Sequence, residues 1–230
     1  MVNNRNFVKF LKGVGLITGP SLETTRHTNL GKIKGMLCGN QPDGKGIKPV
    51  YLAFGTILHE RFLLRKATNK QLAKKTKKLL KQLTPLDLRK IEGMLKSLNR
   101  HPVVIELMKK TKCEKTFKRK FHGINFQFTP DAVKLILLIG LDLKTTACDD
   151  LKDFIEKAFG YGYFRQSATY MEAHTPPLKD FYIIGIGKTY PHQVFIVHVT
   201  EHKDKFKYAQ KELEFLLYFY LHYGTFKAIA

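Results

Sequence analysis

Residues 129–146 read Thr-Pro-Asp-Ala-Val-Lys-Leu-Ile-Leu-Leu-Ile-Gly-Leu-Asp-Leu-Lys-Thr-Thr, and this stretch decides the fold. Its apolar run, Leu135–Leu141, is short and rich in leucine and isoleucine, which predicts a buried strand over residues 134–144. Side chains alternate between the two faces of a strand, so Asp142 and Lys144 are expected to leave the same face. Asp131 precedes the run by enough residues for a tight turn and an antiparallel return. We therefore expect two carboxylates and an ammonium at one strand end.

This combination of charges suits metal-assisted hydrolysis of a phosphodiester. Carboxylate oxygens are the ligands that Mg²⁺ prefers, and the ion keeps several waters. The metal polarises the phosphate and lowers the pKa of a bound water, while a nearby ammonium offsets the negative charge that builds up during the reaction. An Asp-x-Lys pair also occurs as a solvated charge pair at the end of a strand. The pattern therefore gains its meaning from motifs elsewhere in the chain.

The charge of the 230-residue chain is strongly basic and unevenly distributed. Lys and Arg number 40 against 19 Asp and Glu, a net charge of +21, while 43% hydrophobic residues predict a folded domain with a sizeable core. From Arg61 to Lys120, 20 basic residues stand against four acidic ones, so +16 of the net charge lies there. This excess favours a polyanionic partner bound in a salt-dependent manner. Solvated lysine faces on helices would give the same composition.

The cysteines and the apolar segments bear on the compartment. Cys38, Cys113 and Cys148 are odd in number and far apart, which indicates neither a disulfide framework nor a cysteine-rich metal site. Lysines interrupt the N-terminal apolar residues, so no signal peptide is predicted. No apolar run approaches the ~20 residues of a membrane span. We expect a cytoplasmic protein with no membrane partner.

Periodicity predicts a single domain, 1–230, in which helices precede a sheet. We assign 51–113 to a basic helical region, 114–200 to a sheet core and 201–230 to a C-terminal helix. Thr84 followed by Pro85 is typical of a helix start, and Cys148 or Asp149 is expected to cap a helix that ends at Gly160. The period-two pattern after Glu114 predicts a hairpin that turns near His122-Gly123. The remaining expected elements are a helix over 161–174, strands over 181–187 and 193–200, and a helix over 203–223.

Four short motifs carry a family resemblance. Residues 54–60 read Phe-Gly-Thr-Ile-Leu-His-Glu, Pro130-Asp131 forms a Pro-Asp pair, 142–146 read Asp-Leu-Lys-Thr-Thr, and 166–170 read Gln-Ser-Ala-Thr-Tyr. In this order they resemble the histidine helix, the Pro-Asp, the Asp-x-Lys-Thr-Thr and the Gln-x-x-x-Tyr motifs of the PD-(D/E)XK nuclease superfamily. Within it the chain is similar to the RecE-like and RecB-like exonucleases of recombination and phage replication.

The resemblance implies an α/β (α+β) fold with a restriction-endonuclease-like core, in which helices flank a mixed central β-sheet and a basic helical region is added. It implies that Asp131 and Asp142, with the carbonyl of Leu143, bind Mg²⁺ or Mn²⁺. Lys144 would position the attacking water, and His59 would be a metal ligand or a phosphate contact.

Three further site residues follow from the same resemblance. Gln166 and Tyr170 would hold the DNA strand, and they lie four residues apart, hence on one helix face. Glu114 is a secondary candidate because relatives carry an acidic residue at the start of this strand. The second acid of the site is Asp142 rather than Glu, which is common in this branch. The full phosphate-binding loop pattern Gly-x-x-x-x-Gly-Lys-Ser/Thr, typical of helicases, does not occur in the sequence.

The implied activity is a metal-dependent exonuclease that acts on linear duplex DNA or its ends in recombination or phage DNA metabolism, in the cytoplasm of a bacterial host. Relatives also form homo-oligomeric rings and work with a single-strand annealing protein. Two alternatives are an endonuclease or spacer-processing nuclease of the same fold, and a catalytically inactive basic protein that binds nucleic acid. The sequence leaves the polarity of digestion and the strand preference open.

Overall fold

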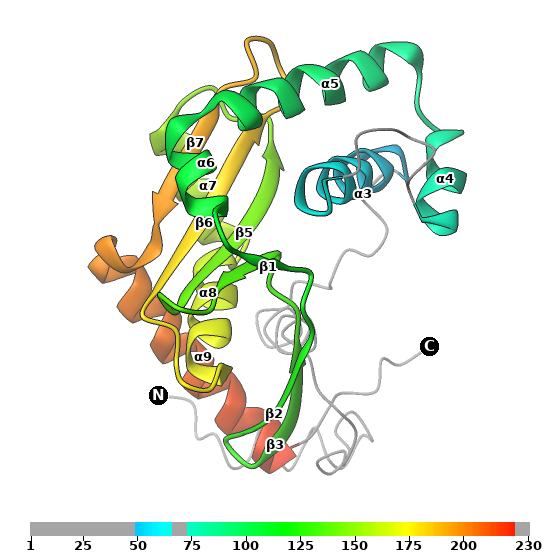
Figure 1. Ribbon diagram of the computed structural model, residues 1–230. Coiled ribbons are helices and arrows are strands. Elements are labelled where there is room, and N and C mark those ends of the chain that lie inside the picture. The colour runs from blue at the N-terminus through cyan, green and yellow to red at the C-terminus, as the bar shows by residue number, and fades with distance from the viewer. Residues whose placement is uncertain (1–48, 66–72, 224–230) are drawn as a thin grey trace, which may run out of the picture.

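The structure is a computed structural model that describes residues 49–65 and 73–223 (Figure 1). The predictions for residues 1–48, 66–72 and 224–230, including the one for Cys38, lie outside the described residues. Five strands form a mixed sheet in the order β1-β4-β5-β6-β7, in which β5 and β6 are parallel and the other pairs are antiparallel. Their bounds are Lys112–Cys113, Ala132–Lys134, Ile139–Thr146, Asp180–Gly187 and Val194–His198.

Helices cover both faces of this sheet (Figure 1). The first face carries α3, α4, α5 and α6, which span Pro49–Leu63, Lys74–Leu80, Pro85–Arg100 and Pro102–Met108. The second face carries α7, α8 and α9, which span Leu151–Gly160, Tyr163–Ala173 and Lys203–Tyr223, with a short 3-10 helix at Val199–Glu201 before the last. Ile183 and Ile184 are both buried, but in separate apolar cores, because successive strand residues face opposite sides. Among the described residues, no helix is both long and apolar enough to cross a membrane.

The apolar run 135–141 is a hairpin rather than one strand. Ala132 pairs with Leu141 and Lys134 with Ile139, so residues 135–138 must turn between β4 and β5. Ile136 is 85% exposed at this turn. The prediction of a strand over 134–144 is therefore wrong in its first part, because apolar composition alone does not distinguish a buried strand from an exposed turn between two short ones.

The hairpin predicted after Glu114 is confirmed, and it forms a separate two-stranded sheet. Strands β2, Phe117–Phe121, and β3, Ile124–Phe128, are joined at His122-Gly123. His122 and Gly123 both have positive φ, +46° and +79°, as a two-residue turn between antiparallel strands requires. Phe128 stacks on Tyr170 of α8, with ring centroids 5.4 Å apart. The hairpin thus packs onto the second face while its outer side carries lysines.

Helix starts agree with the capping signals, with one difference. Thr84 and Asp87 form a reciprocal capping box at α5, in which each side chain accepts a hydrogen bond from the other's backbone N–H. The N-cap of α7 is Asp150, whose side chain accepts a hydrogen bond from the Asp153 N–H at 2.8 Å. It is one residue after the predicted Asp149, an error typical of boundaries read from sequence.

Candidate active site

The candidate site forms where strand β4 stops covering the edge of β5. The last β4–β5 pair on this side is Ala132 with Leu141, so Leu143 lies beyond the end of β4. The Leu143 N–H donates a hydrogen bond to Asp131 Oδ2 at 2.6 Å. This side chain thus satisfies a backbone group that a longer β4 would have paired.

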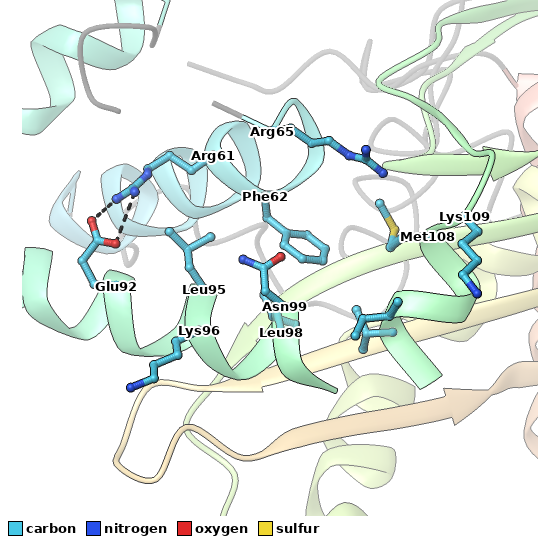
Figure 2. A pocket seen from close by; sticks show the side chains of 12 residues that line it. Arg61, Phe62, Arg65, Glu92, Leu95, Lys96, Leu98, Asn99, Met108 and Lys109 are labelled. Atoms are coloured by element: carbon cyan, nitrogen blue, oxygen red, sulfur yellow. Dashed lines mark hydrogen bonds and ion pairs between the residues drawn. The ribbon is translucent and has the colours of Figure 1, made fainter. Parts of the chain in front are cut away.

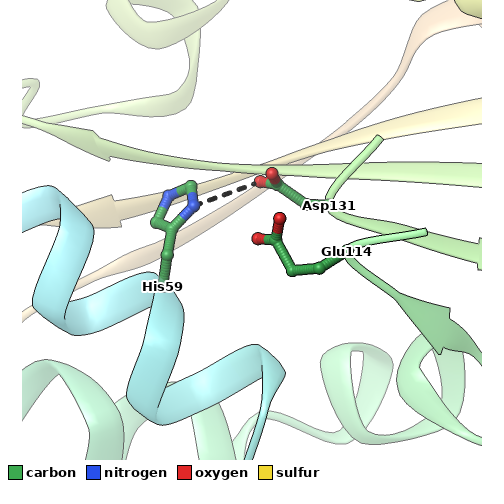
Figure 3. A group of neighbouring side chains, drawn as sticks. All are labelled: His59, Glu114 and Asp131. Atoms are coloured by element: carbon green, nitrogen blue, oxygen red, sulfur yellow. Dashed lines mark ion pairs between the residues drawn. The ribbon is translucent and has the colours of Figure 1, made fainter. Parts of the chain in front are cut away.

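His59, Glu114 and Asp131 converge at this edge (Figure 3). Each offers one ligand atom, and these atoms all lie within 4.8 Å of one another. His59 Nδ1 is 3.5 Å from Asp131 Oδ2, and the Glu114 N–H donates to the Asp131 carbonyl at 2.9 Å. Two carboxylates suit a hard divalent cation, and the imidazole adds a nitrogen donor of the kind that transition metals favour. Glu114, predicted as a secondary candidate, belongs to this trio.

Asp142 and Lys144 leave the opposite face of β5 from Leu143, as the alternation of the strand predicts. Asp142 is 3% exposed and forms an ion pair with Lys144. Asp142 is not among the residues whose ligand atoms cluster with His59, and its role as a metal ligand stays a prediction. The Lys144 Nζ also lies 4.8 Å from the ring centroid of Tyr163. Tyr163 was not predicted, although it precedes Gln166 by one helical turn.

Burial and neighbouring charges raise the pKa of two acids of the trio. Burial, then the negative charge of Asp142, raises the pKa of Asp131 well above its usual range, although Lys144 opposes this. Partial burial first, and the negative charge of Asp142 next, also raise the pKa of Glu114, the most exposed residue of the three. Carboxyl groups in this setting favour holding a proton, and a divalent cation would replace it. Burial lowers the pKa of His59, which favours the neutral imidazole that ligates metals.

Lys144 is held as a cation. Burial alone would lower its pKa, but Asp142 and Asp131 more than offset that effect, so the pKa of Lys144 is raised above its ordinary value. An ammonium with a raised pKa keeps its proton at neutral pH and does not act as a general base there. It can hold negative charge and orient a water.

The Gln166–Tyr170 pair lies on one face of α8, as predicted. The Gln166 Nε2 donates to Tyr170 Oη at 3.0 Å. Burial raises the pKa of Tyr170 to about 12, against the opposing effect of the Gln166 hydrogen bond. Tyr170 is buried and Gln166 only half-buried. Gln166 is therefore the member better placed to reach a bound strand, and Tyr170 holds its side chain.

Two hollows lie beside the basic helices, and the second comes close to the site. One, of about 580 Å³, lies between α3, α5 and α6 and is lined by apolar and basic side chains, with Arg61 paired to Glu92 (Figure 2). The other, of about 630 Å³, shares Arg65 and Met108 with the first. It reaches Leu63, one helical turn beyond His59 on α3. Its charged lining residues are all basic: Arg65, Lys110, Lys112 and Lys115.

Comparison with known proteins identifies the family. A crystal structure of a presumed exonuclease from Eubacterium rectale has the same fold, with a TM-score of 0.62 at 17% identity over 94% of this chain and 85% of that chain. None of the curated proteins matches this sequence. Residues 44–222 match the family described as "PDDEXK-like domain of unknown function (DUF3799)". These matches confirm the restriction-endonuclease-like fold with its mixed, helix-flanked sheet. The chain belongs to this PDDEXK-like family and thus to the PD-(D/E)XK nuclease superfamily.

Proposed function

We propose that the protein is a metal-dependent deoxyribonuclease that degrades linear DNA from its ends. The observation that carries this proposal is the convergence of the His59, Glu114 and Asp131 trio beside the Asp142–Lys144 pair at one edge of β5. Membership of a PDDEXK-like family supports phosphodiester hydrolysis, and the presumed exonuclease from Eubacterium rectale shares the fold. End resection in recombination or phage DNA metabolism, as in the RecE-like and RecB-like enzymes, is the role we infer.

The metal would be Mg²⁺ or Mn²⁺, held by His59, Glu114 and Asp131. Asp142 and the carbonyl of Leu143 are the further ligands we propose. When bound, the ion supplies a Lewis acid for the phosphate and a water of lowered pKa. The residues that hold it lie at the solvent-facing edge of the sheet, where Glu114 is exposed. A phosphodiester backbone can therefore reach the site.

The remaining side chains position the reacting groups. The Lys144 ammonium orients the attacking water and offsets the charge that develops on the phosphate. Gln166, held by Tyr170, donates hydrogen bonds to the strand near the cleaved bond. Neutral His59 adds a nitrogen donor without adding charge to the site.

The basic hollows are the surface on which we place the DNA backbone. The hollow that adjoins the trio has Arg65, Lys110, Lys112 and Lys115 as its charged lining and no carboxylate, so it suits a run of phosphates. We also propose that the protein forms a homo-oligomeric ring, works with a single-strand annealing partner and acts in the cytoplasm of a bacterial host. These three proposals rest on the resemblance to recombination exonucleases.

Purified protein incubated with end-labelled linear duplex, with and without Mg²⁺, tests the proposal. We expect degradation of the linear duplex only when Mg²⁺ or Mn²⁺ is present, and no attack on a covalently closed circle of the same sequence. Cleavage of the closed circle would identify an endonuclease instead. Salt-sensitive binding without cleavage at any metal concentration would contradict the enzymatic proposal and leave a basic binding protein.

A further inference from the structure

We propose that Tyr161 and Tyr163 form a stacking site for a nucleobase that neighbours the cleaved phosphate. The inference rests on the proposed function and adds to it a contact with the base, which the metal site and the basic hollows do not provide. The site is a nonspecific aromatic platform, so it suits any of the four bases.

The two rings lie between the solvent and the Lys144 ammonium. Tyr161 is 69% exposed, and its ring centroid lies 5.8 Å from that of Tyr163, with the planes inclined at 51°. Tyr163 in turn lies under the Lys144 ammonium, 4.8 Å from its ring centroid. An exposed aromatic face therefore lies one ring away from the ammonium that we propose acts on the scissile phosphate.

The turn that presents Tyr161 is firmly held. The Tyr161 N–H donates to the Lys157 carbonyl at 2.8 Å, and the Gly162 N–H donates to the Phe159 carbonyl at 3.0 Å. Gly162 has φ +76°, and a Cβ there would lie 2.8 Å from Arg165 Nη2. The backbone conformation thus favours glycine at this position. Arg165 is anchored by its ion pair with Glu212 of α9, at 2.6 Å.

A tyrosine on a rigid turn suits a nucleobase better than it suits a phosphate. The ring offers a large apolar face and few rotatable bonds, so stacking costs little conformational entropy. The phosphate groups are already matched by Lys144 and the basic hollows. A single exposed tyrosine is common on protein surfaces, but Tyr161 differs from Tyr190, which is 88% exposed on the loop after β6. Only the former contacts a ring that touches the catalytic cation.

Substitutions of Tyr161 on two DNA substrates test the site. One substrate is an ordinary linear duplex, and the other carries abasic tetrahydrofuran residues at its terminal nucleotides. With ordinary DNA, we expect Tyr161→Ala to raise KM about 5- to 150-fold, the loss of one stacked base, whereas Tyr161→Phe and the control Tyr190→Ala stay near wild type. With the abasic DNA, Tyr161→Ala and wild type should have the same KM.

Three results would overturn the inference or separate it from the proposed function. Equal KM values for Tyr161→Ala and wild type on ordinary DNA would contradict stacking. An equal loss on both substrates would show that the residue supports the fold or the phosphate site instead. If the wild type cleaves no DNA, the proposed nuclease function fails, but binding of the two labelled duplexes in Ca²⁺ still decides the stacking site, since only the ordinary duplex should depend on Tyr161.

Discussion

The apolar cores on the two faces of the central sheet differ in composition. Under α7, α8 and α9 the core is aromatic, with Phe154 stacked on Phe195 at 5.4 Å. Under α3 and α5 it is mainly aliphatic, with Ile57 and Leu98 fully buried, and the basic residues of α3, α4, α5 and α6 lie on this side of the sheet. The site takes Lys144 from the aromatic face and His59 from the basic one. We infer that the aromatic face stabilises the fold and the basic face binds the substrate. Catalysis requires residues from both faces.

Substitutions in the Asp142–Lys144 ion pair, on the aromatic face, should have the largest effect on activity. We expect Lys144→Met and Asp142→Asn to lower kcat/KM on linear duplex by at least about 10³-fold. The first removes the ammonium that we propose acts on the reacting phosphate, and the second removes a proposed metal ligand. The matched control is Lys157→Met, since Lys157 pairs with Asp153 at 2.7 Å on the exposed side of α7. Near wild-type kcat/KM in a folded Lys144→Met protein would show that the pair is structural.

Truncation of a buried side chain on the aromatic face should strongly lower the free energy of unfolding. Phe154 fills the space over Gly185, where a Cβ would lie 2.6 Å from its ring. Phe154→Ala should lower the free energy of unfolding by about 3–5 kcal/mol, measured by urea denaturation. Phe215→Ala, a substitution of the same kind at a 49% exposed position of α9, should change it by no more than about 0.5 kcal/mol. Equal losses would mean that this core does not dominate stability.

The metal site joins the two faces, and its charges should cost stability when no cation is bound. The folded protein raises the pKa of Asp131, so the associated stability is present at low pH and is lost as pH rises through that raised pKa. Asp131→Asn should therefore raise the Tm of the metal-free protein at pH 8. Mg²⁺ at about 100 times its Kd should stabilise the wild type by about 2.7 kcal/mol and the variant by much less. A wild-type Tm that does not respond to Mg²⁺ would contradict the proposed ligands.

The basic face should act through salt-dependent binding rather than through stability. Lys112→Gln, in the hollow beside the trio, should weaken DNA binding and lower the slope of log K against log salt by about 1. Lys207→Gln on the exposed side of α9 should leave the slope unchanged. The comparison requires binding measured in Ca²⁺ or without metal, so that cleavage does not interfere. The same slope in both variants would place the DNA on another surface.

Several features of the fold and of the candidate site could be predicted from local sequence. The turn at His122-Gly123 and the shared face of Asp142 and Lys144 depend on short-range rules and are confirmed. The exposed turn within the apolar run was missed because the pairing of β4 with β5 decides it. Glu114 was only a secondary candidate, since its position depends on the Cys113–Ala132 register between distant segments. The contact of Tyr163 with Lys144 likewise requires the tertiary structure.

The smallest effect we expect comes from the capping box at the start of α5. Thr84→Ala should cost about 1 kcal/mol of stability, because it removes the acceptor for the Asp87 N–H, whereas Thr84→Ser should keep this acceptor.

The effect of Thr84→Ala should depend on pH. Hydrogen bonds from Thr84 lower the pKa of Asp87, so the stability that the capping box contributes is present above the ordinary aspartate pKa and is lost as pH falls through the lowered value. The difference between wild type and Thr84→Ala should therefore shrink in acid, and a difference independent of pH would mean that the box is not what holds this end of the helix. Because α5 lies on the basic face and away from Lys144, kcat at neutral pH should not change in either variant, which separates the stability of that face from the chemistry of the site.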